Sequence, residues 1–356
     1  MTILKFTEEN FSEKHSKFLD ENFAPLTQYG FYADWQNEIG RKQYVFTVTD
    51  QDNNIKLFMQ SFIVAIGFGK NFLHSPYGPV LDKKIINSEE LKTVLVVLIE
   101  GLRSISAKFN CSFTRLDFVP NIDQILQKVG NLGLIQASKR SKDGSFFQPR
   151  VEWALDLTKD PEQIYREIDS KNRYAIRLAE RKNVQVEIIK ENISEYFDIF
   201  YKMMTDTAER NSFSLHKREY YTGVFESLKK NNNGRLVLTK IDNQIATCLV
   251  FVDYNQTTMF LFGASSTLLN KIVPTSHFAH WKNIQYSKSS GFKIYNFGGV
   301  ENDKYQSESL RSLTTFKKRF GGYEIEHSGF YDLVVDKFIY KIFLFKKLIR
   351  FFKNLI

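Results

Sequence analysis

Residues 235–264 read RLVLTKIDNQIATCLVFVDYNQTTMFLFGA. Three runs rich in β-branched and aromatic residues, RLVLTKI, QIATCLVFV and TTMFLFGA, are separated by short polar segments. This spacing is typical of consecutive antiparallel strands that are joined by tight turns. The stretch therefore predicts a three-stranded meander within a mixed α/β domain.

Helical and strand patterns alternate on both sides of this meander. Before it, the periodicity predicts a helix over 170–182, a strand over 184–189 and helices over 194–210 and 217–230. After it come a helix that begins at Thr275, a strand, a second helix and two final strands. This order is similar to that of the GNAT acyltransferase fold, although a fold alone does not determine function.

The first half of the chain repeats the same pattern loosely. It contains strands near 43–48 and 55–68, a long helix over 89–108, and then a further strand and helix. We therefore expect an α/β (α+β) protein with two tandem GNAT-like domains, residues 1–150 and 151–336.

The composition is that of a large globular protein. The chain has 356 residues, 43% of them hydrophobic, and can bury the cores of two domains. Cys111 and Cys248 are isolated from each other, which excludes a disulfide framework and a CxxC metal site. The N-terminus lacks the features of a signal peptide, and no run reaches the roughly 18 apolar residues of a membrane span. We expect a cytoplasmic protein that does not cross the membrane.

The end of the chain is strongly basic. Overall, 49 basic residues stand against 40 acidic ones, which favours anionic partners or serves solubility. Residues 337–356, KFIYKIFLFKKLIRFFKNLI, mix apolar side chains with lysine and arginine and contain no acid. This pattern is typical of a basic amphipathic helix on an anionic membrane surface. We expect the tail to bind the inner face of the plasma membrane; a helix docked on the protein's own core is the alternative.

Five segments carry a family resemblance. They are HSPYGPVLD (74–82), KNRYAIRLAERKNV (171–184), AERNSFSLHKREYY (208–221), NFGGVEND (296–303) and LTTFKKRFGGYEIEHSGFYDLV (313–334). The last is the most specific, because it combines the pairs Phe316-Lys317 and Gly321-Gly322 with Gly329-Phe330-Tyr331. In this order the segments resemble the FemABX family of aminoacyl-tRNA-dependent peptidyltransferases. The short distance between residues 221 and 235 indicates a compact member without the helical arm of larger relatives.

The resemblance implies an aminoacyltransferase. Such an enzyme moves an amino acid from aminoacyl-tRNA to the stem-peptide amine of a peptidoglycan precursor and needs no further cofactor. By the same resemblance, Lys317 would stabilise the oxyanion and bind the tRNA end, and Phe316 would pack against its adenosine. Asp117 would accept the proton of the amine. The alternatives are a solvated lysine and a structural carboxylate.

The resemblance also implies where the two substrates bind. A diphosphate-containing precursor, lipid-linked or uridine-linked, requires cations and polar contacts, and the basic tail favours the lipid-linked form. The implied precursor residues are His216, Lys217, Arg218, Tyr220, Phe262 and Tyr77. The alternatives are a solvated helix start for the cluster at 216–218 and a core position for Phe262.

One predicted helix is rich in cations. Residues 171–182 contain five basic residues and one acid, and the three arginines are spaced four residues apart. This spacing places them on one helix face, which suits the backbone of tRNA or, alternatively, a solvated surface. The predicted tRNA-binding residues are Lys171, Arg173, Arg177 and Arg181.

Other function classes fit less well. An acyl-CoA-dependent enzyme needs a Q/RxxGxG/A loop for the pyrophosphate, but the corresponding stretch GASSTLLNKIVPTS (263–276) has one glycine. His277 and His280 have no acids nearby in sequence, so we expect no metal site. A transferase for another cell-surface polymer and a non-catalytic, membrane-associated adaptor remain as alternatives.

Overall fold

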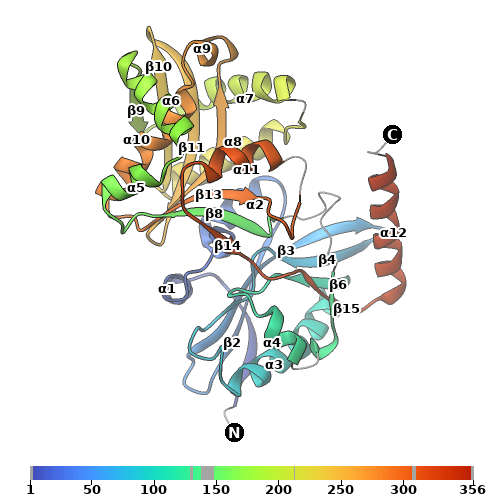
Figure 1. The fold of residues 1–356 in the computed structure, drawn as a ribbon. Helices are drawn as coiled ribbons and strands as arrows, with labels where there is room; N and C mark the ends of the chain where they lie inside the picture. The colour runs from blue at the N-terminus through green and yellow to red at the C-terminus, as the bar shows by residue number, and fades with distance from the viewer. Residues whose placement is uncertain (1–2, 129–130, 138–147, 212, 307–309, 354–356) are drawn as a thin grey trace. The chain divides into compact units, whose positions relative to one another are not determined.

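The computed structural model describes residues 3–128, 131–137, 148–211, 213–306 and 310–353 (Figure 1). The chain divides into two compact units. Unit 1 consists of Met1–Arg150 and Glu326–Ile356, and unit 2 consists of Val151–Ile325. Each unit is built on one mixed sheet against which helices pack.

The sheet of unit 1 has the order β1-β2-β3-β4-β6-β15-β7, and β5 pairs with β3. The β4 and β6 strands are parallel, and the other neighbours are antiparallel. The strands are β1 (Lys5–Glu9), β2 (Gln43–Thr49), β3 (Ile55–Gly67), β4 (Lys70–Ser75), β5 (Val80–Leu81), β6 (Cys111–Leu116), β7 (Leu134–Gln136) and β15 (Tyr331–Val334).

Helices cover both faces of this sheet. The α3 helix buries Leu91, Leu95, Leu98 and Leu102, spaced three or four residues apart, in the same core as Leu73 of β4. Phe72, the residue before Leu73 in β4, points to the other face of the sheet, because side chains alternate along a strand. The helical segments are α1 (Glu13–Glu21), η1 (Leu26–Gln28), α2 (Gly30–Glu38), α3 (Glu90–Lys108), α4 (Asp123–Lys128), η2 (Asn131–Gly133) and α12 (Lys337–Lys353).

The sheet of unit 2 has the order β14-β8-β13-β12-β11-β10-β9. Its centre is the predicted meander, which forms β10, β11 and β12 with antiparallel pairing. The strands are β8 (Val151–Asp156), β9 (Gln185–Ile189), β10 (Gly234–Ile241), β11 (Gln244–Tyr254), β12 (Thr257–Ser265), β13 (Ile294–Val300) and β14 (Tyr323–Glu326).

Two pairs of helices cover the sheet of unit 2 on opposite faces (Figure 1). The α6 and α10 helices share a core with Phe251 of β11, whereas α7 and α8 approach Phe262 of β12 from the other side. The Asp160 side chain caps α5, and Pro161 occupies its first turn. The helical segments are α5 (Pro161–Glu167), α6 (Ser170–Arg181), η3 (Ile193–Tyr196), α7 (Phe197–Asn211), α8 (Arg218–Lys230), α9 (Thr267–Ile272), α10 (Thr275–Ser289) and α11 (Arg311–Lys318).

The predicted fold class, a mixed α/β protein with two GNAT-like sheets, is confirmed. The C-terminal boundary differs from the prediction. Residues 326–336 were expected in the second domain, but β15 pairs with β6 and β7 in the sheet of unit 1. The reason is burial: Tyr331 and Leu333 join the α3 core, and Asp332 binds Arg115.

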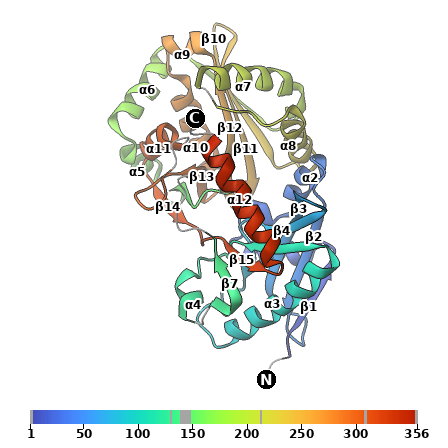
Figure 2. The ribbon, with the colours of Figure 1, turned by 90° about the vertical axis from the view of Figure 1, so that its right-hand side faces the viewer.

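The tail is also less separate than the sequence predicted. It forms the expected helix, α12, but Tyr340 and Phe343 pack against Phe72 and Phe113 of unit 1. Figure 2 shows that α12 begins beside β15. Phe338 and Phe345 are 72% and 62% exposed. The side chains from 346 onward lie outside the described residues. None of the described helices has the length and hydropathy of a bilayer-spanning segment.

Candidate functional site

A fork in the sheet of unit 2 is the starting point for the site. The parallel ladder between β12 and β13 joins residues 257–259 to residues 294–296, after which β12 continues to Ser265 and β13 to Val300. The corresponding pair in unit 1, β4 and β6, is joined through Ser75 and Leu116. Backbone groups that leave a ladder become available to other partners. The fork therefore offers backbone donors and acceptors that unit 1 does not offer at its parallel pair.

A bulge in β13 shapes this fork. The register between β13 and β8 shifts between Asn296 and Gly299. Gly298, within the bulge, has a φ of +73°, which favours glycine. Its N–H donates to Oδ1 of Asn296 at 2.7 Å. The Asn296 side chain therefore holds the bulge from inside.

The amine of Lys317 lies at the fork. The α11 helix, which packs on β13, directs Nζ of Lys317 to the carbonyl oxygen of Gly299, at 2.6 Å. A Cβ atom at Gly298 would lie 4.0 Å from this Nζ and 3.6 Å from the carbonyl oxygen of Phe260 on β12. The lysine is 6% exposed. The predicted catalytic lysine is thus an enclosed group at the point where β12 and β13 separate.

The charge of this lysine is tuned by its surroundings. Burial lowers the pKa of Lys317 to about 8, and the negative charge of Glu152 opposes the shift. Glu152, on β8, accepts a hydrogen bond from Nδ2 of Asn296 at 2.9 Å. A lysine with a pKa near 8 is largely protonated at neutral pH and loses its proton readily, as groups at functional sites often do.

Phe316 has a different environment from its neighbour. Its ring lies 5.0 Å from that of His277, 5.5 Å from that of His280 and 5.4 Å from that of Phe320. Nδ1 of His280 hydrogen-bonds to the Tyr295 hydroxyl at 2.7 Å. Burial lowers the pKa of His280 well below its usual value, so this ring is neutral. Phe316 therefore fastens α11 to α10, and its predicted contact with adenosine remains a prediction.

The predicted precursor residues of unit 2 gather beside β12. The rings of His216 and Tyr220 are 4.2 Å apart, and that of Phe262 is 6.4 Å from Tyr220. Tyr221, which the sequence did not single out, completes the group at 5.2 Å from Phe262. We call His216, Tyr220, Tyr221 and Phe262 the aromatic cluster. The tyrosine pair at 220–221 was the signal that could have revealed the fourth member.

The basic residues next to the aromatic cluster differ in their contacts. Lys217 is exposed. Arg218 forms an ion pair with Asp198, and its guanidinium lies 4.8 Å from the ring centre of Tyr201 and 4.9 Å from that of Phe197. Arg218 thus links α8 to α7 in the structure, so its predicted phosphate contact would have to compete with this arrangement.

The cationic stripe on α6 is mostly exposed. Lys171, Arg177 and Arg181 face solvent. Arg173 differs, because its Nη1 donates to the carbonyl oxygens of Arg166, at 2.8 Å, and Ile168. Arg173 therefore stabilises the junction between α5 and α6, and the other three residues form the exposed stripe.

Asp117 and Tyr77 lie together in unit 1. Asp117 is 1% exposed, and its Oδ1 has no hydrogen-bond partner among the described residues. Burial raises the pKa of Asp117 to about 7, while the charges of His327 and Arg150 lower it. The Tyr77 ring stacks on His327 at 4.1 Å, and its hydroxyl donates to the Pro149 carbonyl at 2.6 Å. His327 and Arg150 were not predicted, because residues that meet only through the fold leave no local pattern.

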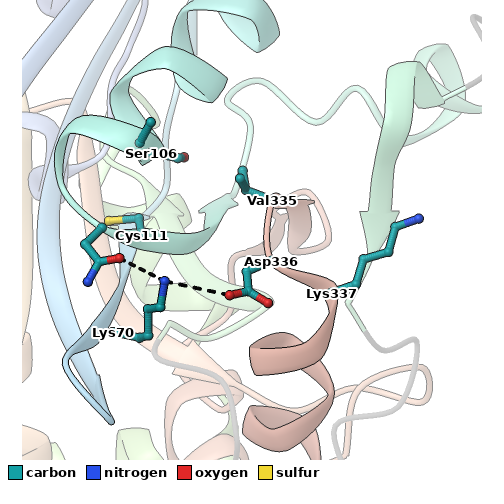
Figure 3. Close-up of a pocket in the computed structure, with 8 residues that line it drawn as sticks. Lys70, Ser106, Cys111, Val335, Asp336 and Lys337 are labelled. Atoms are coloured by element: carbon teal, nitrogen blue, oxygen red, sulfur yellow. Dashed lines mark hydrogen bonds and ion pairs between the residues drawn. The ribbon is translucent and has the colours of Figure 1, made fainter.

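One pocket of unit 1 is lined by a different set of residues (Figure 3). It has a volume of about 560 Å³ and lies where α12 begins. Nζ of Lys70 is 2.9 Å from Oδ1 of Asn110 and 3.8 Å from Oδ2 of Asp336. The lining residues are Lys70, Ser106, Ala107, Asn110, Cys111, Val335, Asp336 and Lys337. The pocket therefore contains none of the predicted site residues. Among the described residues, no group of three His, Cys, Asp or Glu side chains could hold a metal ion.

Comparisons with known proteins identify the family of the chain. A model of the FemAB family matches residues 120–245 and 239–347. The chain is 21% identical to a lipid II:glycine glycyltransferase of Staphylococcus saprophyticus, over 74% of this chain and 78% of the relative. It is 20% identical to the protein of that name from Staphylococcus haemolyticus, over 70% of this chain and 75% of the relative. Among solved structures, FemX superposes with a TM-score of 0.79, 18% identity and coverage of 94% and 99%. A tandem GNAT protein from the clavulanic acid biosynthesis pathway superposes with a TM-score of 0.51 and 10% identity. The match covers 93% of this chain and 98% of that protein.

Proposed function

The chain belongs to the FemAB family, and from this membership we infer that it transfers an amino acid from an aminoacyl-tRNA to the stem-peptide amine of a lipid-linked peptidoglycan precursor. Enzymes of this class are aminoacyltransferases. The relatives' names specify lipid II and glycine, which makes these the first substrates to test. The observation that carries the proposal is the enclosed amine of Lys317 at the fork between β12 and β13.

The proposed reaction requires stabilisation of an oxyanion and removal of a proton from the acceptor amine. The acceptor amine attacks the carbonyl carbon of the aminoacyl ester, and the carbonyl oxygen becomes an oxyanion. The C–O bond to the tRNA ribose then breaks, the ribose oxygen takes up a proton, and the amine loses one. Lys317 donates to the oxyanion in this proposal, because a desolvated ammonium stabilises developing negative charge more strongly than one in water.

Asp117 is the proposed proton acceptor. Its pKa of about 7 suits a general base at neutral pH, and its Oδ1 is not engaged by the described residues. The backbone of Tyr77, whose ring stacks on His327, hydrogen-bonds to the same carboxylate. Asp117 belongs to unit 1 and Lys317 to unit 2.

The aromatic cluster and its cations are the proposed contacts of the precursor. Aromatic rings bury the apolar parts of a stem peptide, and Lys217 and Arg218 bear charge opposite to that of a diphosphate. The exposed cations Lys171, Arg177 and Arg181 of α6 are the proposed contacts of the tRNA backbone, with Arg173 supporting the helix.

The α12 helix is the proposed membrane contact at the inner face of the plasma membrane. Its inward residues Tyr340 and Phe343 fix it to unit 1, while Phe338 and Phe345 project from the protein. Residues 337–356 contain no acid. Apolar side chains flanked by cations suit a bilayer with anionic headgroups, which is where a lipid-linked acceptor resides.

The experiment supplies purified protein with bacterial tRNA that is charged with radiolabelled amino acids and with either lipid-linked or uridine-linked muropeptide. The proposal expects label on the lipid-linked precursor and its loss when ribonuclease is added first. Transfer that survives ribonuclease would contradict the use of tRNA. Label on another cell-surface polymer would identify a different acceptor, and no transfer to any acceptor would favour an adaptor.

A further inference from the structure

Two buried residues on β8 and β13, next to the fork, have no predicted role in the reaction. We propose that Glu152 and Asn296 are positioning residues for Lys317, which hold the β13 bulge and keep the lysine amine charged and directed into the fork. The proposal rests on the function proposed above, in which Lys317 acts as the donor to the oxyanion.

The Asn296 side chain links two strands through hydrogen bonds. Its side chain is buried, and both ends of its amide are used. Nδ2 donates to Oε2 of Glu152 at 2.9 Å, and Oδ1 accepts from the N–H of Gly298 at 2.7 Å. One side chain therefore joins the β8 carboxylate to the β13 bulge. An apolar replacement leaves buried polar groups on both sides without this partner, which is costly in a protein interior.

Glu152 lies opposite the carbonyl that receives the lysine. In the ladder between β8 and β13, Glu152 is the partner of Gly299, whose carbonyl oxygen accepts from Nζ of Lys317 at 2.6 Å. Both Glu152 and Lys317 are buried. A buried cation remains charged only where opposite charge or acceptors compensate its lost hydration. The carboxylate and the carbonyl supply these two forms of compensation.

The other charged groups near Lys317 do not supply negative charge. The α10 helix contributes His277 and His280, and burial lowers the pKa of both. The α11 helix contributes Lys318, and Arg319 follows its end. Among the described residues, Glu152 is the one whose charge raises the pKa of Lys317. Glu301, next to β13, pairs instead with Arg311 at 3.6 Å.

The neighbouring lysine provides a matched control. Lys318 pairs with Glu324 of β14 at 2.8 Å, and about a third of each side chain is exposed. Glu324→Gln removes a carboxylate from the same sheet as Glu152→Gln does. The lysine that it affects, Lys318, is the residue after Lys317. Glu152→Asp keeps the charge at Glu152 with a shorter side chain.

The first test is the pH profile of kcat for transfer, obtained by varying the concentration of aminoacyl-tRNA up to saturation. The lysine must be protonated to donate, so the rate of the wild-type protein falls as pH rises through about 8. Loss of the opposing charge in Glu152→Gln moves this fall to lower pH by roughly one unit. We expect kcat to fall about tenfold or more, with the KM for tRNA unchanged, and Glu152→Asp to recover part of the rate. Glu324→Gln should match the wild-type profile.

A second test does not need activity. The ε-carbon resonance of Lys317, assigned by its absence in Lys317→Arg, is followed through pH in protein labelled with 13C-lysine. Glu152→Gln and Asn296→Ala should each lower the titration midpoint, while Glu324→Gln should not. Unchanged midpoints in folded variants would overturn the proposal. If wild-type protein transfers nothing but the midpoints move, the proposed function fails and the positioning of Lys317 stands. Should Glu152→Gln not fold, Asn296→Ala carries the test.

Discussion

Arg115 and Asp332, 217 residues apart in the chain, form a bidentate ion pair in the core of unit 1. Nε and Nη2 of Arg115 donate to the two carboxylate oxygens of Asp332 at 2.8 and 2.7 Å. The Tyr340 hydroxyl donates to the same carboxylate at 2.8 Å. This one acidic side chain therefore connects β6, β15 and the start of α12, and it fixes the end of the chain to unit 1.

We predict that Asp332→Ala strongly destabilises unit 1. Removing the carboxylate leaves a buried guanidinium without its partner, a change that costs about 3–5 kcal/mol. Hydrogen exchange of peptides from β6 and β15, measured by mass spectrometry, should accelerate accordingly. The control is Glu8→Gln, which removes a surface pair with Lys108 and should change stability by no more than about 1 kcal/mol. Equal protection in both variants would contradict the role of the pair.

Asp117 should make the stability of unit 1 depend on pH. Burial raises its pKa to about 7, so the native carboxyl keeps a proton that the unfolded chain has lost at pH 5. Its contribution is therefore greatest in acid and is lost as pH rises through about 7, at up to about 1.4 kcal/mol per pH unit. Asp117→Asn should remove this decline, as measured by unfolding midpoints between pH 5 and 8. Asp52→Asn, in an exposed turn, should retain it.

The exposed phenylalanines of α12 should govern membrane binding. We expect the double variant Phe338→Ser/Phe345→Ser to bind anionic vesicles about tenfold less tightly or worse, because each ring loses its apolar burial in the interface. Cosedimentation with vesicles measures the loss. Phe23→Ser removes an equally exposed ring elsewhere in unit 1 and serves as the control. Equal loss in the control, or strong binding to neutral vesicles alone, would argue against the proposed surface.

The stripe on α6 should contribute to tRNA affinity through charge. Arg177→Ala/Arg181→Ala should weaken binding and reduce the salt slope of the binding constant by about one to two, since each lost phosphate contact releases fewer counterions. Filter binding over a series of salt concentrations measures both effects. Lys202→Ala/Lys229→Ala removes two cations from α7 and α8 as the control. A slope that stays the same in the α6 variant would remove the stripe from the account.

Local patterns predicted most of unit 2. The meander and the basic helix at 170–182 correspond closely to β10–β12 and α6, because alternation and capping are encoded over short distances. The partner of β15 was not predictable in this way. The pattern of FYDLVV indicates a strand but not a sheet, and its partners in unit 1, Arg115 among them, lie far away in the sequence.

The site was predictable only where a residue matched a known family. Lys317 and Asp117 were named on that basis, but their burial and charge environments became visible only in the fold. Glu152 and Asn296 were not identified as site residues. A glutamate and an asparagine on separate strands acquire a joint role only when β8 and β13 pair. Arg173 and Arg218 illustrate the converse, since their contacts with neighbouring helical segments were not visible in the sequence.

The most direct measurement is single-turnover transfer from charged tRNA to lipid-linked muropeptide by wild-type protein, Lys317→Ala and Lys318→Ala, with tRNA binding measured in parallel. The account predicts that Lys317→Ala loses about a hundredfold in rate while all three proteins bind tRNA, and that Lys318→Ala transfers like wild type. Transfer by Lys317→Ala at the wild-type rate would contradict the assignment of the fork between β12 and β13 as the active site.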